Sequence, residues 1–152
     1  MRYIMMLSFI SIFAIGCKKN DNPVQAFQGG PIVASELSDS VLYVLSISKD
    51  TYSIQDTLQG SFSITNNANT MRHFISGDSP IFLWTVKDDT GHLIMGVPAP
   101  NHHLTDEFNL NPNESTVFVV NNEIPNIPKG SYTLNAFLYN IGPNLSLLIQ
   151  IQ

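Results

Sequence analysis

Cysteine is nearly absent from this chain of 152 residues, in which Cys17 is the single example. One cysteine cannot form an intramolecular disulfide, so a disulfide-stapled scaffold is excluded. Cysteine-rich zinc ribbons and CxxC redox motifs are excluded for the same reason. The fold must therefore be held by an apolar core, which a hydrophobic content of 43% can supply.

Charged residues are also scarce, at 12% of the chain compared with about a quarter in an average globular protein. Positive charge is the scarcer sign. From Ser35 onward there are four Lys or Arg residues and eleven Asp or Glu residues, a net charge of −7. Nucleic-acid-binding domains gather Lys and Arg on one face to neutralise phosphates. The composition therefore argues against nucleic acid as a partner and against direct docking onto anionic lipid.

Residues 1–16 are expected to be a cleaved signal peptide. Arg2 supplies a positive charge, and residues 4–15 form an apolar run broken only by two serines. This run is too short to cross a bilayer, which takes about 20 residues. Its length suits the apolar region of a signal peptide, about 7–15 residues long. An ordinary secretory signal and a marginal membrane helix are the alternatives.

The run ends in Ala-Ile-Gly-Cys at residues 14–17, which resembles the lipobox of bacterial lipoproteins. The resemblance implies cleavage between Gly16 and Cys17 and lipid on the Cys17 sulfur, and several acyl chains anchor a protein stably. The polar residues that follow resemble those of outer-membrane lipoproteins of Gram-negative bacteria. We therefore expect a lipid-anchored cell-envelope protein, in which residues 17–34 are the lipidated Cys and a flexible tether.

Residues 35–152 are expected to form one domain with a dominant period of two, which is typical of β-strands. Strands are predicted over the following residues: 41–47, 57–65, 71–75, 81–86, 92–96, 115–121, 132–139 and 145–151, with a short strand near Phe108. Trp84 is expected in the core. No sustained helical period occurs. The prediction is an all-β domain, an antiparallel Ig-like β-sandwich of about eight strands.

Four motifs follow one another along this domain. They are Phe-Ser-Ile-Thr-Asn-Asn at residues 62–67, a strand and Asp-x-x-Gly turn at 84–91, a turn at 110–114 with Asn113 in place of Gly, and Gly-Ser-Tyr-Thr-Leu-Asn-Ala at 130–136. In this order they resemble the BsuPI-type intracellular proteinase inhibitor domain, a small Ig-like sandwich. The resemblance covers residues 40–139. It implies structural roles for Gly130 and Tyr132, the latter as a corner tyrosine whose hydroxyl ties down a turn.

Metal binding is an alternative for one segment. His102, His103, Asp106 and Glu107 could form a site in a loop, although zinc needs three or four ligands that converge on one point. Solvated loop residues are the favoured interpretation. The Asp-Asp pair at residues 88–89 supplies too few oxygen ligands for calcium and is predicted to form a hairpin turn.

Catalytic motifs are not found in the sequence. There is no Gly-x-Ser-x-Gly elbow and no phosphate-binding glycine loop. Paired carboxylates for glycoside hydrolysis stay open, but nothing selects a pair. The prediction is therefore a protein without catalytic residues, metal or cofactor.

Three functions are considered. The leading hypothesis is a non-enzymatic binding module, held at the membrane by lipid on Cys17, that contacts another envelope protein. The alternative is a proteinase inhibitor that acts through the Val97–Asn113 loop, where prolines would stiffen an exposed binding segment. Its candidate binding residues are Pro98, Pro100, His102, His103, Asp106 and Glu107. The third hypothesis is an enzyme or a metal-dependent ligand binder.

Overall fold

The computed structural model describes residues 31–77, 80–97 and 105–152, which form eleven β-strands and no helix. The strands are β1 (Ile32–Ser38), β2 (Val41–Ile47), β3 (Thr51–Tyr52), β4 (Thr57–Asn66), β5 (Arg72–Ser76), β6 (Phe82–Lys87), β7 (Leu93–Gly96), β8 (Asp106–Leu110), β9 (Ser115–Glu123), β10 (Gly130–Leu138) and β11 (Ile141–Ile151). Among these residues no helix is long and apolar enough to cross a membrane. The predicted signal peptide and Cys17 lie outside the described residues.

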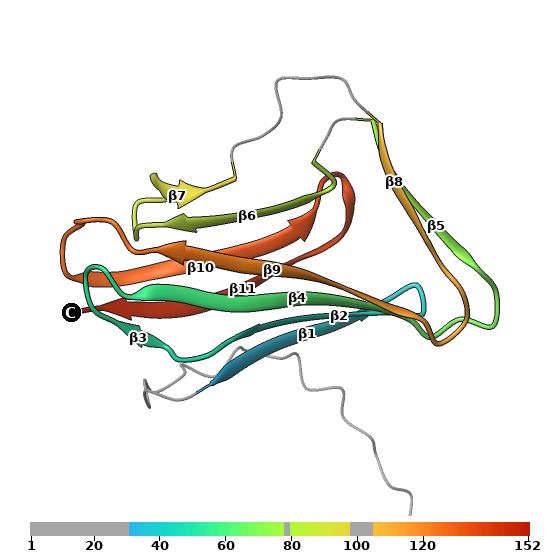
Figure 1. Cartoon of the computed structure of the whole chain (residues 1–152), viewed down its shortest axis with the longest axis horizontal. Coiled ribbons are helices and arrows are strands. Elements are labelled where there is room, and N and C mark those ends of the chain that lie inside the picture. Colours follow the sequence, from blue (N-terminus) through green and yellow to red (C-terminus); the bar gives the residue numbers. More distant parts are fainter. Residues whose placement is uncertain (1–30, 78–79, 98–104) are drawn as a thin grey trace, which may run out of the picture.

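Two sheets pack face to face, and a two-stranded ribbon stands at one end of them (Figure 1). Sheet A has the strand order β1-β2-β4-β9, sheet B has the order β3-β11-β10-β6-β7, and the ribbon consists of β5 and β8. The pairings between described strands are antiparallel, except that β3 runs parallel to β11. The predicted antiparallel β-sandwich is confirmed, with eleven described strands instead of about eight.

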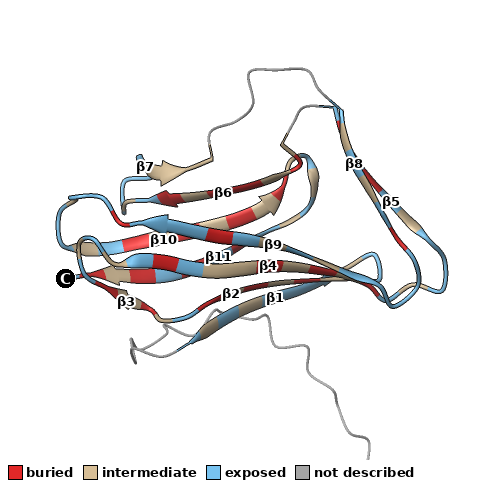
Figure 2. Cartoon of the chain, viewed as in Figure 1, coloured by how far each residue is buried: buried red, intermediate tan, exposed pale blue. Residues whose placement is uncertain are grey.

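The core lies between the two sheets, because each strand turns every second side chain inward. Buried and less buried residues alternate along β2, β4, β10 and β11 (Figure 2). Trp84 on β6 is only 5% exposed, so its predicted place in the core is confirmed. The hydrophobic residues with no exposed surface in the described part of the chain are Leu45, Leu58, Phe62, Ile64, Val120, Leu134, Ala136 and Ile149.

Strand β1 differs from the expected organisation. It begins at Ile32, so the last three residues assigned to the tether, Ile32 to Ala34, belong to sheet A. All seven residues of β1 pair with β2, and β1 also contacts β11 of sheet B. No regular alternation marks this strand in the sequence, since all of its side chains are exposed or half-buried at a sheet edge. The folded domain therefore begins before residue 35.

Two turn predictions are confirmed by hydrogen bonds and backbone geometry. The Tyr132 hydroxyl donates to the Pro128 carbonyl at 2.6 Å, which is the bond expected of a corner tyrosine. Asn113 has a φ of 63°, in the left-handed region that glycine adopts most easily. Asparagine tolerates this region better than most residues, which explains how it can stand in the place of Gly in that turn.

The turn between β6 and β7 is organised by one carboxylate. Asp88 Oδ1 accepts hydrogen bonds from the backbone N–H of Thr90 and of His92 and from the Thr90 hydroxyl. The Thr90 hydroxyl makes the largest contribution to lowering the pKa of Asp88 below its ordinary value. Asp88 thus forms the predicted hairpin turn.

Asn66 ties the ribbon to sheet A. It lies at the end of β4 and is completely buried. Its Nδ2 donates to the Leu110 carbonyl at 2.9 Å and to the Thr70 carbonyl at 2.8 Å, and its Oδ1 accepts from the Ala68 N–H at 3.0 Å. Leu110 ends β8 and Thr70 precedes β5, so this side chain fixes both strands of the ribbon.

Candidate functional site

A ladder of six aromatic rings joins the ribbon to both sheets. Successive ring centroids are between 4.7 and 6.2 Å apart; in order, the rings are Tyr43, Phe62, Phe82, Phe118, Phe108 and Phe74. Phe118 on β9 contacts both Phe82 of sheet B and Phe108 of the ribbon, so sheet A, sheet B and the ribbon meet at this ring. Such contacts add about 0.5–1.5 kcal/mol each beyond burial of the rings. The ladder therefore holds β9 and the ribbon in place from the inside.

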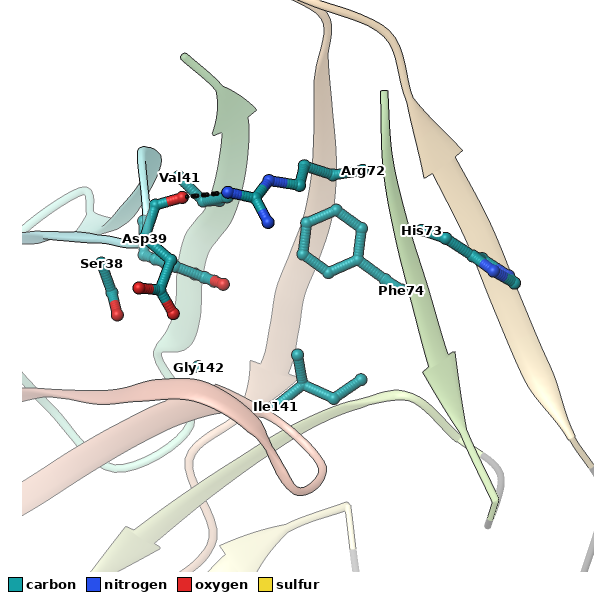
Figure 3. Close-up of a pocket in the computed structure, with 9 residues that line it drawn as sticks. Ser38, Asp39, Val41, Arg72, His73, Phe74, Ile141 and Gly142 are labelled. Atoms are coloured by element: carbon teal, nitrogen blue, oxygen red, sulfur yellow. Dashed lines mark hydrogen bonds between the residues drawn. The ribbon is translucent and has the colours of Figure 1, made fainter. Parts of the chain in front are cut away.

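A pocket of about 180 Å³ lies where the ribbon meets the sandwich. Its walls are the turn between β1 and β2, the first residues of β2, strand β5 and the start of β11 (Figure 3). Tyr43 and Phe74, the two ends of the aromatic ladder, both line it. Because a water molecule in the liquid occupies about 30 Å³, the pocket has room for only a small group.

Arg72 provides the positive charge of this pocket. Its Nη2 donates to the Asp39 carbonyl at 2.8 Å, while its Nε is buried without a hydrogen-bond partner among the described residues. Burial raises the pKa of the Tyr43 hydroxyl; Asp39 adds to the rise and Arg72 opposes it. A Cβ at Gly142 would come within 2.6 Å of the Tyr43 hydroxyl, so this wall requires glycine.

His73 and Ser38 also line the pocket, but they do not form a nucleophile and base. Figure 3 shows the His73 ring directed away from Arg72, Asp39 and Ser38. His73 Nε2 lies 3.2 Å from Glu107 Oε2 on the neighbouring strand of the ribbon. A general base must approach the hydroxyl that it activates to hydrogen-bond distance. The geometry of this pocket provides packing and a charged wall, with no such pair.

The candidate binding residues of the predicted loop are only partly described. Residues 98–104, which include Pro98, Pro100, His102 and His103, lie outside the described residues. Asp106 and Glu107 begin strand β8, so they are strand residues and not part of an irregular loop. The short strand predicted near Phe108 is confirmed.

The two acidic residues of that segment have separate partners. Asp106 Oδ2 accepts from the Ile81 N–H at 3.1 Å, whereas Glu107 contacts His73. Neighbouring side chains on a strand point to opposite faces, which explains the separation. In the part of the chain that the structure describes, no three His, Cys, Asp or Glu side chains are grouped to hold a metal ion. The metal-site hypothesis would depend on His102 and His103, which are not among those residues.

The outer face of sheet A is a second candidate site, which the sequence analysis did not identify. Three rows of paired residues run across its four strands. The rows are Val33, Ser46, Ser61 and Val119; Ser35, Val44, Ser63 and Val117; and Leu37, Leu42, Thr65 and Ser115. None of these residues is charged. We call them the uncharged face.

Aliphatic side chains of the uncharged face are exposed to solvent. Leu37 is 63% exposed, Val117 58% and Val119 68%. Hydroxyls between them bond to each other across the strands: Ser46 Oγ lies 3.0 Å from Ser61 Oγ, and Thr65 Oγ1 lies 2.8 Å from Ser115 Oγ. Exposed apolar patches on an otherwise polar surface mark interaction sites. The uncharged face thus has the composition of an interface centre, which is depleted of charge.

No protein-family model and no curated protein matches this sequence. Among solved structures, an alkylpurine DNA glycosylase of Pseudomonas fluorescens bound to DNA with an abasic-site analogue has a TM-score of 0.48 and 11% identity, over 70% of this chain and 28% of that one. A β-glucosidase of Erythrobacter marinus has a TM-score of 0.48 and 12% identity, over 80% of this chain and 16% of that one. A β-glucosidase of Listeria innocua in complex with isofagomine has a TM-score of 0.46 and 7% identity, over 80% of this chain and 16% of that one. This chain spans less than a third of each of these proteins, and their activities are properties of those proteins.

Proposed function

We propose that this protein is a lipid-anchored, non-enzymatic binding module of the bacterial cell envelope that contacts another protein through the uncharged face. The observation that carries the proposal is the face itself. The domain has a net charge of −7, yet three rows of residues on the outer face of sheet A contain no charged side chain. The lipobox-like sequence at Cys17 supports the lipid anchor, and the polar residues after it support a location in the outer membrane of a Gram-negative bacterium.

The size of the face limits what the partner can be. Given the spacing of residues and strands in a sheet, the uncharged face measures about 14 Å in each direction. A stable protein interface buries about 800 Å² on each partner, which is several times the area of a face with sides of about 14 Å. The partner therefore also contacts residues outside the face, on a domain whose net charge is −7. Charge complementarity favours a partner with an uncharged centre and basic residues around it.

The anchor is tested by metabolic labelling with a fatty acid that carries a clickable group. The wild-type chain is expected to take up the label and to fractionate with the outer membrane. Cys17→Ser is expected to abolish labelling. Labelling that persists in Cys17→Ser would contradict lipidation at this residue.

The contact is tested by photocrosslinking in the envelope. A crosslinking amino acid at Val117 is expected to give a discrete adduct, whereas one at Leu148, an exposed aliphatic on β11 of sheet B, is not. Leu37→Glu should remove the adduct by placing a charge on the face, and Leu148→Glu is the matched control. Equal adducts from Val117 and Leu148, or none from Val117, would contradict the proposal.

A proteinase is the class of partner that the resemblance to the BsuPI-type domain suggests. Titration of the protein against a panel of serine proteinases tests it directly. One-to-one inhibition that is lost in Leu37→Glu would identify the partner of the face. Inhibition that survives Leu37→Glu and is lost when residues 97–113 are replaced would assign the activity to that segment.

A further inference from the structure

Strand β9 is an edge strand of sheet A. It is nine residues long, and among the described strands only β4 pairs with it, so within the described residues one side of its backbone is left unpaired. At its two ends, Asn66 N donates to Glu114 O at 2.9 Å and Ile124 N donates to Asp56 O at 2.8 Å. Backbone bonds between antiparallel strands involve every second residue of each strand, and the register of β9 with β4 has no shift. The even-numbered residues of β9 therefore bond to β4.

The odd-numbered residues of β9 direct their N–H and C=O groups to the free edge. They are Ser115, Val117, Val119, Asn121 and Glu123, and all five side chains are exposed. Three of them also belong to the uncharged face. An extended segment that paired with this edge would therefore continue both the backbone ladder and the uncharged face of sheet A.

The other described edges of the sandwich are shorter or covered. The edge strands of sheet B, β3 and β7, have two and four residues, and β1 at the opposite edge of sheet A contacts β11. Natural sheets protect long edges with Lys, Pro or bulges. Between Ser115 and Asn122 strand β9 has none of these, and it has no charged residue. Its inner side is held by the aromatic ladder through Phe118, so the edge is preorganised.

Charge at the two ends of the edge decides between partners. Glu114 precedes β9 and Glu123 ends it, and both are exposed. If two copies paired antiparallel about Val119, Glu123 of each copy would lie opposite Ser115 of the other, one residue along the strand from Glu114 on the opposite face. Negative charge of both copies would thus gather at each end of the paired strands, and like charges close together repel. A partner strand with Lys or Arg at both ends would instead be attracted.

We propose that β9 accepts an extended segment of a partner protein as a fifth strand of sheet A, and that this segment has about seven uncharged residues between basic residues. The inference rests on the proposed function and specifies how the partner binds. Main-chain hydrogen bonds to Val117 and Val119 supply affinity, the aliphatic side chains of the face supply apolar contact, and the two glutamates select basic ends.

The test uses the purified full chain in detergent micelles and a synthetic peptide of alternating Thr and Val with Lys at both ends. In the free protein, amide hydrogens of Phe118 and Val120 are expected to exchange slowly and those of Val117 and Val119 rapidly. The peptide should slow exchange at Val117 and Val119. A peptide with Glu at both ends, and one N-methylated at alternate residues, should bind at least about tenfold more weakly, as expected when one good interaction is lost.

Val119→Pro is the decisive variant, because it removes a free-edge N–H without removing a bond to β4, and proline is tolerated at such edge positions. It should weaken peptide binding about tenfold, whereas Val119→Thr, which keeps the N–H, should not. Thermal unfolding checks that both variants are folded. Equal binding by the two variants, or no protection of Val117 and Val119 at about 1 mM peptide, would overturn strand addition.

The crosslinking assay separates this inference from the proposed function. If the adduct from Val117 survives in Val119→Pro and is lost in Leu37→Glu, the face binds a partner but β9 does not accept a strand. If the adduct survives both changes, the proposed function also fails. A dimer of the chain that dissociates in Val119→Pro would replace the basic partner segment with a second copy, and so overturn the partner class inferred here.

Discussion

Replacing Asn66 with alanine should destabilise the domain strongly, because its uncharged side chain is completely buried and hydrogen-bonded. The change removes three side-chain hydrogen bonds. The bond to the Leu110 carbonyl is buried, and leaving that acceptor without a donor costs about 1–3 kcal/mol. The bonds to Thr70 and Ala68 are partly buried, so water can replace them in part and each loss costs about 0.5–1 kcal/mol.

The total for Asn66→Ala is about 3 kcal/mol in the free energy of unfolding. For a domain of roughly 120 residues, 1 kcal/mol corresponds to about 4 °C, so Tm should fall by about 12 °C. Calorimetry or circular dichroism on the two proteins measures this shift. Asn67→Ala is the matched control, since Asn67 is the exposed neighbour and its backbone bond to Ser40 survives the change. A decrease in Tm of less than about 4 °C in Asn66→Ala, or an equal decrease in Asn67→Ala, would refute the reasoning.

Three further predictions concern other parts of the fold. Tyr132→Phe removes the bond to the Pro128 carbonyl and should lower the free energy of unfolding by about 1 kcal/mol in chemical denaturation; no change would argue against a stabilising corner. Burial raises the pKa of Tyr43 and of Tyr52 above the ordinary value of 10.0. The part of the free energy of unfolding that comes from keeping these two hydroxyls protonated is fully present below pH 10 and should be lost as the pH rises through the raised pKa values. A series of Tm measurements at increasing pH tests this. Gly96 has a φ of 146° and a Cβ there would collide with the Trp84 carbonyl, so Gly96→Ala should cost about 1–3 kcal/mol, whereas a cost below about 0.5 kcal/mol would contradict that packing.

Local chemistry in the sequence was sufficient to place most strands and several turns. Alternation located β2, β4, β10 and β11, because one side of each faces the core and the other does not. The structural roles of Asn113 and Tyr132 were implied by the resemblance to the BsuPI-type motifs, and each depends on a few neighbouring residues. Strands β1 and β3 were missed. One lies at an exposed edge, and the other has only two residues.

Features that depend on strand order could not be predicted. The uncharged face consists of short Ser-, Thr- and aliphatic-rich stretches that look unremarkable singly and become a surface only in the order β1-β2-β4-β9. The free edge of β9 follows from which residues bond to β4, which is a matter of register. The aromatic ladder joins residues as far apart as Tyr43 and Phe118. Asn66 directly follows the predicted strand 57–65, but its hydrogen-bond partners could not be named from the sequence.

Strands β1 and β9 are the two opposite edges of one sheet, and this arrangement has a mechanical consequence. If lipid on Cys17 holds the chain and a partner holds β9, any tension between membrane and partner enters the domain at Ile32 and crosses sheet A from strand to strand. Strand β1 has no fully buried side chain and no ring in the aromatic ladder, so it is the part that would yield first. Its seven residues would lengthen the tether by about 23 Å when they peel away. The domain would then absorb a sudden pull by losing strand β1 and the residues that β1 contributes to the uncharged face, while the pairing of β9 with β4 stays in place.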